Sequence, residues 1–390
     1  MSTPIDKSTW TKIKFGELAQ SITERVDDPA SCGMDRYVGL EHLDPRCMTV
    51  KRWDSPEAVT STKLKFQPGD VIFGRRRAYQ KKVARADFAG ICSAHALVLR
   101  ARPERMLPEF LPVFMSSDAF LDRAVQISVG SLSPTVNWGT LAQQEFLVPP
   151  LDEQKRIAEL LWLTEEYSES IAERRAILSA LHAALLTETI DNWQGSRVAL
   201  SDVAELSRGV SYATSDFQED GLGRPLLNLK CVTRDASFAP GGVKWVREGL
   251  GADRLAQAGD LFVACTDLTP GRLLVGAPFY FDGYASAMAP TYSMDLARIR
   301  SKTDDFTLEM LFLALCSPAA RRFARVNTAG STVGHLNLSA ITLLQVPPAT
   351  APFWNDLLAR TAAARSALEE LRLEEKRILN ARTALLEVLV

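Results

Sequence analysis

The chain has 390 residues, of which 46% are hydrophobic, and a formal net charge of −2, as expected for a globular protein of two to three domains. This charge excludes a uniformly basic nucleic-acid coat, although residues 1–150 carry 20 Lys and Arg against 17 Asp and Glu, and residues 151–194 carry 4 against 9. The six cysteines form no CxxC pair and have no histidine at ligand spacing, so we expect no zinc site, and no motif for a cofactor is found either. The sequence shows no signal-peptide pattern and no apolar run of ~20 residues, which predicts a cytoplasmic protein without a membrane span.

The first 150 residues predict a domain that mixes strands and helices. Residues 10–26 are amphipathic, and short segments rich in Val, Ile, Phe and Tyr then predict the strands of a mixed sheet. These strands are expected at 37–43, 61–66, 70–73, 82–85 and 95–100. A helix at 108–125, a loop at 128–134 and a last strand at 145–148 follow. Pro149 and Pro150 end that strand, and we expect Asp152 to be the N-cap of the next helix.

Residues 151–190 and 351–390 each predict one long helix, because both segments are rich in Ala, Leu, Glu, Arg and Lys. In both, the seam residues recur at alternating steps of three and four, which is typical of a coiled coil. The alternative is that each helix packs only on its own globular neighbour. The expected seams are Ile157, Leu160, Thr164, Tyr167, Ile171, Arg174, Leu178, Leu181 and Leu185, and Trp354, Leu357, Thr361, Ala364, Leu368, Leu371, Glu375, Ile378, Arg382, Leu385 and Leu389.

From residue 197 the pattern of the first 150 residues begins again. The stretch from Gln67 to Asp70 returns at Gln257 to Asp260, and Val148-Pro-Pro returns as Val346-Pro-Pro. Further matches lie 200 positions apart: Glu109 and Glu309, Ser117 and Ser317, Gly130 and Gly330, Ser131 and Ser331. This collinear series indicates a tandem duplication of one globular module followed by one long helix. We predict modules at 1–150 and 195–350 and long helices at 151–194 and 351–390.

No catalytic constellation emerges from the sequence. None of the four histidines lies in an HExxH or GxSxG motif, and a phosphate loop of the GxxxxGK type is absent. The repeat replaces His95 with Met288, which favours a buried packing role for His95. We therefore expect a protein that is not itself an enzyme.

A basic segment at residues 74–85, GRRRAYQKKVAR, carries the main functional signal. It has six cations in twelve residues and no acid, a pattern that a polyanion would neutralise with release of counterions. Arg and Gln can also hydrogen-bond to base edges, and Tyr can stack. A solvated charged hairpin remains the alternative. The candidate DNA contacts here are Arg75, Arg76, Arg77, Tyr79, Gln80, Lys81 and Lys82.

In the second module the aligned segment at 264–272 is polar but hardly basic. Thr266 and Asp267 are candidates only through this alignment, and the cations cluster instead at Arg321, Arg322 and Arg325. We expect the Gly-Ser loops at Ser131 and Ser331 to approach phosphate. If both modules bind nucleic acid, they should read different sequences.

The arrangement resembles the specificity (S) subunit of type I restriction-modification systems, most clearly at 69–99, at the two Gly-Ser loops and at VPPLDEQKRIAELL (148–161). The resemblance implies an α+β fold with two tandem target-recognition domains, whose long helices form an antiparallel coiled coil that acts as a ruler. It further implies that each domain reads one half of an asymmetric, split double-stranded DNA site. Two methyltransferase (M) subunits would dock on the chain and perform the chemistry, and it stays open whether a restriction/translocase (R) subunit joins.

The chain departs from this family pattern at 349–355, where the second helix lacks the EQ-type start of the first. This departure puts the second M-subunit docking surface in doubt. The rival hypothesis is a coiled-coil scaffold that does not bind DNA.

Overall fold

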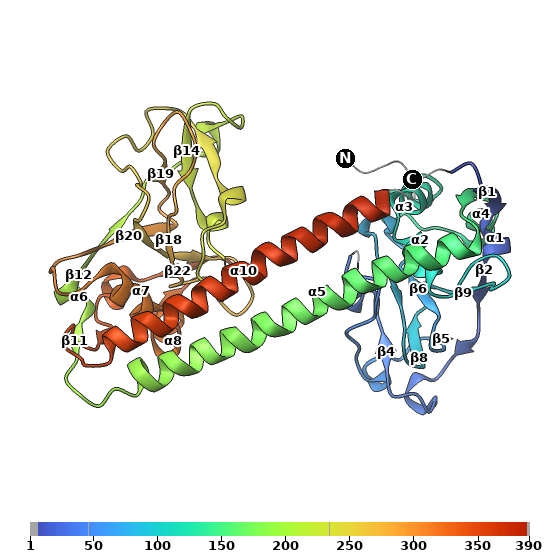
Figure 1. The fold of residues 1–390 in the computed structure, drawn as a ribbon, viewed down its shortest axis with the longest axis horizontal. Coiled ribbons are helices and arrows are strands. Elements are labelled where there is room, and N and C mark those ends of the chain that lie inside the picture. The colour runs from blue at the N-terminus through green and yellow to red at the C-terminus, as the bar shows by residue number, and fades with distance from the viewer. Residues whose placement is uncertain (1–6, 46, 234, 388–390) are drawn as a thin grey trace. The chain divides into compact units, whose positions relative to one another are not determined.

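The computed structural model of the protein describes residues 7–45, 47–233 and 235–387 (Figure 1). It separates into two compact units. Unit 1 takes the chain up to Glu173 together with the part from Arg372 onward, and unit 2 comprises Arg174–Leu371. Each unit thus combines one globular module with part of both long helices, whereas the domain boundaries inferred from the sequence stay a prediction.

Unit 1 contains two four-stranded sheets. In the first, all neighbouring strands are antiparallel, and in the second β4 runs parallel to β8. The strand orders are β2 (Ala19–Ile22), β9 (Leu97–Ala101), β6 (Val71–Phe73), β7 (Val83–Arg85), and β3 (Arg25–Val26), β5 (Lys63–Phe66), β8 (Gly90–Ser93), β4 (Tyr37–Val38). In addition, β1 (Thr11–Lys14) pairs with β10 (Glu145–Val148). Sequence analysis missed β8, since Gly90 opens it, and the predicted strand at 37–43 is confirmed only at its first two residues.

The helices of module 1 are α1 (Phe15–Leu18), α2 (Phe110–Met115), α3 (Asp118–Gln126) and α4 (Trp138–Ala142). The sequence predicts a single helix at 108–125. This prediction is wrong in one respect, because the structure has two helices there. The hydroxyl of Ser117 accepts a hydrogen bond from the backbone N–H of Phe120, so this serine caps α3 and separates it from α2. The apolar faces pack around Phe15, Phe114 and Phe120, which are fully or almost fully buried.

Unit 2 repeats the first of these sheets. Its strand order is β12 (Ala204–Arg208), β20 (Leu296–Ser301), β16 (Leu261–Ala264), β18 (Pro278–Tyr280). The second sheet has the order β13 (Phe217–Gln218), β15 (Lys244–Val246), β14 (Arg224–Leu227), β19 (Thr291–Tyr292), with β14 parallel to β19. β11 (Val198–Ala199) pairs with β23 (Gln345–Val346), and the helices are α6 (Leu200–Val203), α7 (Leu308–Cys316), α8 (Pro318–Val326) and α9 (Leu338–Ile341).

The residues that repeat in the sequence have the same structural tasks in both units. Asp70 and Asp260 each accept a backbone hydrogen bond from the Gln three residues earlier, at 2.8 and 2.9 Å. Each also pairs with an arginine of the neighbouring strand, Arg100 at 2.7 Å and Arg298 at 3.4 Å. Ser317 caps α8 as Ser117 caps α3. The duplication was therefore visible in the sequence because turns and caps tolerate few other residue types.

The two long helices are α5 (Leu151–Leu186), which continues into a π-helical turn at Thr187–Asp191, and α10 (Trp354–Glu387). The expected N-cap is wrong, because α5 begins one residue before Asp152 and the backbone N–H groups of Glu153 and Gln154 donate to Pro150. In the described parts of the chain, none of the helices combines the length and the apolar character that spanning a bilayer needs.

The helices run antiparallel within each unit. In unit 1, Leu386 near the end of α10 packs in one core with Ile157 and Leu161 near the start of α5. In unit 2, Leu186 at the end of α5 packs with Trp354 at the start of α10. The coiled-coil prediction is confirmed, with a clear difference between its two seams.

The predicted seam of α10 agrees with burial, since Trp354, Leu357, Thr361 and Arg382 are all buried, whereas Leu389 lies outside the described residues. The predicted seam of α5 is partly wrong. Leu160, Tyr167 and Leu181 are exposed, and Gln154, Leu161 and Glu165 are buried instead. Polar residues occupy inward positions of α5, so the apolar pattern indicated the wrong face there.

Gln154 fastens the start of α5 to module 1. Its side-chain amide donates to the carbonyls of Arg105 and Pro149, and its carbonyl accepts from the backbone N–H of Leu107, each at 2.9 Å. At the equivalent start of α10, the indole of Trp354 donates to the Pro348 carbonyl at 2.9 Å. The glutamine of the EQ-type start therefore faces its own module, and Trp354 takes over this anchoring in the second helix.

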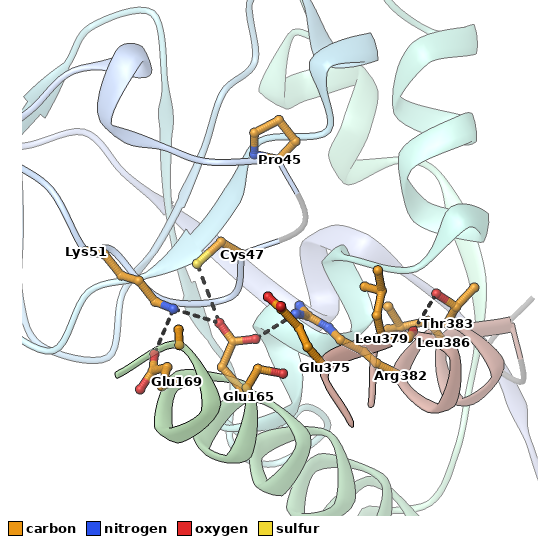
Figure 2. A pocket seen from close by; sticks show the side chains of 12 residues that line it. Pro45, Cys47, Lys51, Glu165, Glu169, Glu375, Leu379, Arg382, Thr383 and Leu386 are labelled. Carbon is orange, nitrogen blue, oxygen red and sulfur yellow. Dashed lines mark hydrogen bonds and ion pairs between the residues drawn. The ribbon is translucent and has the colours of Figure 1, made fainter. Parts of the chain in front are cut away.

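A polar cluster around Glu165 joins the two helices to module 1 (Figure 2). Glu165 pairs with Arg382 of α10 at 2.7 Å, and Lys51 lies 3.7 Å from its other oxygen. That oxygen also accepts long hydrogen bonds from Cys47 and Thr49, at 3.5 and 3.4 Å. The cluster borders a cavity of about 420 Å³, into which Glu169 and Glu375 also project.

Candidate nucleic-acid interface

The basic hairpin, residues 74–82, connects β6 to β7. The two strands pair from Val71↔Arg85 to Phe73↔Val83 and so hold its two ends together. Within the hairpin, Ala78–Gln80 form one turn of 3₁₀ helix, flanked by Arg77 and Lys81, which both adopt the left-handed conformation (φ 58° and 53°). Such a backbone costs free energy for a residue other than glycine and persists only where its surroundings enforce it.

The Gly-Ser loop of module 1, residues 128–134, supplies part of this enforcement. Arg77 donates its backbone N–H to the Pro134 carbonyl at 2.7 Å, and Val136 donates to the Arg75 carbonyl at 3.0 Å. Thr135 bridges to Arg76 on one side and to Val129 on the other. Loops that lie more than fifty residues apart in the sequence therefore form one surface, and Ser131 lies exposed in it.

The cations of the hairpin divide into two groups. Arg76 and Arg77 are exposed, and the side chain of Arg77 has no hydrogen bond or ion pair within the described ranges. Arg75 is half-buried and donates to the Ala94 carbonyl at 3.3 Å. Exposed Tyr79 and half-buried Gln80 follow in the turn.

Lys81 and Lys82 instead hold the hairpin in place. Lys81 forms an ion pair with Asp118 at 2.6 Å, and Lys82 donates to the Leu40 carbonyl at 2.6 Å. We therefore assign these two lysines to the support of the hairpin, and the exposed positive charge is concentrated at Arg76 and Arg77.

His95 was expected to be buried, and this expectation is wrong. It lies exposed in the turn before β9, with its Nε2 3.4 Å from Nη1 of Arg76. Partial burial, followed by the charges of Arg76 and Arg75, lowers the pKa of His95. Exposed Leu132 is a second residue of this surface that the sequence did not single out.

Module 2 builds the same pair of loops as a small sheet. β17 (Thr266–Asp267) pairs with β22 (Gly334–Leu336), which also pairs with β21 (Thr328–Ala329). Gly130 and Gly330 share a positive φ, 118° and 109°, so the backbone of the two Gly-Ser loops turns alike. Ser331 is exposed, as Ser131 is.

The candidates from the alignment lie inside module 2. Thr266 is 3% exposed and donates to Asp295 at 2.9 Å, and Asp267 is fully buried. Burial raises the pKa of Asp267, but hydrogen bonds from Thr269, Val275 and Leu274 outweigh it and leave the pKa lowered. Both residues are buried and organise the loop behind the surface, and their role as DNA contacts stays a prediction.

Arg272 connects the two loops of module 2, a task that the sequence analysis missed because the segment is hardly basic. Its guanidinium donates to the carbonyls of Asp267, Gly330 and Ser331 at 2.6 to 2.9 Å. Arg272 adopts the left-handed conformation (φ 56°), and in the sequence only its position directly after Pro270-Gly271 indicated a turn there.

The three arginines of α8 belong to another part of unit 2, the wall of a cavity. Arg321 donates to the Leu273 carbonyl at 2.7 Å, and burial lowers its pKa to about 10. Together with Arg322 and Arg325 it lines a cavity of unit 2. Within the described ranges, the structure shows no group of three or more His, Cys, Asp or Glu that could hold a metal ion.

Comparison with known proteins shows which family this chain resembles. Residues 7–175 match the family of type I restriction modification DNA specificity domains. A similar protein is the type I restriction enzyme EcoDI specificity subunit of Escherichia coli, which is 24% identical over 173 residues, or 44% of this chain. The match spans 38% of the length of that relative.

Solved structures resemble the whole fold. The type I restriction-modification system S subunit from M. genitalium has a TM-score of 0.59 at 13% identity, over 100% of this chain and 99% of the other. A chain from a study of complex assembly and conformational transition of the type I R-M system has a TM-score of 0.54 at 19% identity, with the same coverage. The resemblance inferred from the sequence is thus confirmed: residues 7–175 of this chain match the type I restriction modification DNA specificity domain family, and the fold is similar to that of type I specificity subunits.

Proposed function

We propose that the chain is the DNA-recognition subunit of a type I restriction-modification complex, in which each module contacts one half of an asymmetric bipartite target. The observation that carries this proposal is the pair of loops that recurs in both modules, joined by backbone pairing. In module 1 these loops present the exposed cations Arg76 and Arg77. In module 2 they present other side chains on the same scaffold, which supports a different half-site.

The side chains of module 1 suit the readout of duplex DNA. Arginine can bind guanine bidentately in the major groove, and Tyr79 and Ser131 offer hydroxyls to phosphate. Leu132, which is 91% exposed, offers an apolar contact for a thymine methyl group. His95 beside Arg76 adds a further hydrogen-bonding group to this surface.

The paired helices would set the spacing of the two half-sites. α5 has 36 residues and is therefore about 54 Å long, which exceeds one turn of B-DNA of ~34 Å. A rigid spacer lets two weak readouts combine through their effective concentration. We further propose that the helices dock methyltransferase subunits, which would perform the chemistry, so that this chain itself is not catalytic.

The direct test is DNA retention by the purified chain together with its methyltransferase. Wild type should retain one duplex sequence at a salt concentration that releases others. Arg76→Ala should weaken retention by about 1–3 kcal/mol and relax one half-site. Lys65→Ala is the matched control, because it also removes one cation, which forms an ion pair with Glu24. No retention of any duplex by wild type would favour the rival scaffold hypothesis, and equal, sequence-independent retention by all three proteins would contradict sequence recognition.

A further inference from the structure

A cavity of about 850 Å³ lies within unit 2, between the module and its segments of both long helices. Four arginines line it: Arg321, Arg322 and Arg325 from α8 and Arg365 from α10. His182 of α5 lies beside them, and the rings of Tyr280 and Phe312 form part of the wall. The volume falls within the roughly 300–1,000 Å³ that small-molecule sites usually have.

The positive charge in this cavity is poorly compensated. Arg322, Arg325 and Arg365 form no ion pair with a carboxylate in the described parts of the chain. Arg365 lies instead over the rings of Phe312 and Tyr280, 4.6 and 5.3 Å from their centroids. The carboxylates at the cavity are Asp235, which pairs with Arg175, and the exposed Asp282 and Glu369. Arg322 and Arg365 are exposed as well.

Three buried polar atoms at this cavity lack a hydrogen-bond partner among the described residues. They are Nη1 of Arg321, Nε2 of His182 and the hydroxyl of Tyr280. Buried polar groups are normally satisfied, so such a cluster indicates that solvent or a ligand completes the site. Burial, followed by the charge of Arg365, also lowers the pKa of His182, which means that a second positive charge is unfavourable there.

Comparison of the two units shows which group is missing. The starts of α5 and α10 correspond at an offset of 200: Gln154 and Trp354, Ile157 and Leu357, Leu161 and Thr361 are all buried. At the same offset, buried Glu165 of unit 1 corresponds to Arg365 of unit 2, which is exposed. Arg382, the ion-pair partner of Glu165, corresponds to His182 of unit 2.

In unit 1 the carboxylate of Glu165 therefore neutralises Arg382. In unit 2 the position that corresponds to Glu165 is occupied by a cation, Arg365. Glu165 lies 2.7 Å from Arg382, and this pair borders the smaller cavity of about 420 Å³ (Figure 2). The equivalent place in unit 2 has two basic groups and about twice the volume. An anion that enters unit 2 would take the position of the missing carboxylate.

We propose that this cavity binds a small organic phosphate of mononucleotide size, with its phosphate among Arg365, His182 and the arginines of α8. Phosphate fits better than a carboxylate because it carries up to two charges and can accept paired hydrogen bonds from several guanidinium groups. The aromatic wall offers apolar surface to the rest of the ligand. The inference does not depend on the DNA-recognition proposal.

The test is calorimetric titration of the full chain with AMP, inorganic phosphate and adenosine. AMP and phosphate should bind, and adenosine should bind at least about 10-fold more weakly than AMP. Arg365→Glu supplies the carboxylate that unit 1 has, so it should reduce AMP binding at least about 10-fold and raise the unfolding temperature of the free protein. Arg377→Glu, on the exposed face of α10 outside the cavity, makes the same change of charge and should bind AMP as wild type does.

Three results would overturn the proposal. They are no binding of AMP or phosphate at millimolar concentration, equal binding of AMP and adenosine, or AMP binding by Arg365→Glu at wild-type affinity. Displacement of AMP by a short DNA duplex would also overturn it, because the arginines would then belong to the DNA interface. If Arg365→Glu does not fold, Arg322→Gln and Arg325→Gln together should show the same loss of AMP binding.

Discussion

Replacing Glu165 by leucine should destabilise unit 1 strongly, although most residues of its helix are exposed or half-buried. Its side chain is 5% exposed and that of Arg382 is 11% exposed, so the ion pair between them is largely desolvated. Breaking a largely desolvated ion pair by removing one partner costs about 3–5 kcal/mol. Glu166, the exposed neighbour, provides the control: Glu166→Leu should change the stability by less than about 0.5 kcal/mol.

When Arg382 is replaced by leucine, Glu165 keeps Lys51 at 3.7 Å and the hydrogen bond from Thr49. The loss should therefore be about 1–3 kcal/mol. The double variant Glu165→Leu/Arg382→Leu has no buried charge left to compensate, so it should be more stable than Glu165→Leu alone, with a coupling energy of about 2 kcal/mol or more.

The four proteins of this cycle can be compared by scanning calorimetry or by urea unfolding. Because the chain has two units, the transition of unit 1 must be resolved from that of unit 2 before a free energy is assigned. Additive losses in the double variant, or a Glu165→Leu loss no larger than that of Glu166→Leu, would refute the assignment of this pair as a buried link between the helices and module 1.

Three further predictions concern other parts of the chain. Gln154→Ala removes three hydrogen bonds to buried or partly buried backbone, so urea unfolding should show a loss of about 2–4 kcal/mol, whereas Lys155→Ala, on the exposed face, should be neutral. The pKa of His182 is lowered below 6.5, so stability should fall as the pH decreases through and below this value, and His182→Gln should show a smaller fall in unfolding temperature between about pH 7.5 and 5.5. If Arg77 contacts phosphate, Arg77→Ala should weaken binding to all duplexes alike and reduce the salt slope of log K by about 1.

Much of the fold could be predicted from the sequence because the duplication repeats residues that turns and helix caps require. The Gly-Asp turn, the Ser117 and Ser317 caps and the Pro-Pro pairs each have a local task that few residue types can perform. The face of α5 could not be predicted in the same way. Its inward positions include Gln154 and Glu165, whose partners lie far away in the sequence.

The charge of the sequence indicated where the candidate interface lies, but it did not indicate which residues are exposed there. Six cations in twelve residues identify the hairpin, whereas only contacts with Asp118 and with the Leu40 carbonyl assign Lys81 and Lys82 to its support. His95 was misjudged because its position beside Arg76 depends on the pairing of β6 with β9. Contacts between distant segments therefore decide which side chains reach the surface. The periodicity of the sequence does not indicate these contacts.

The most direct test of the DNA-recognition account is sequencing of methylated adenines in cells that express this chain with its methyltransferase. The account predicts one asymmetric motif with two specified halves, of which Arg76→Ala/Arg77→Ala alters only one. Insertion of four residues into both long helices, after Glu173 and after Leu371, should lengthen the unspecified spacer and leave both halves intact. An unchanged motif in the double arginine variant, or no sequence motif in cells with the wild-type chain, would contradict the account.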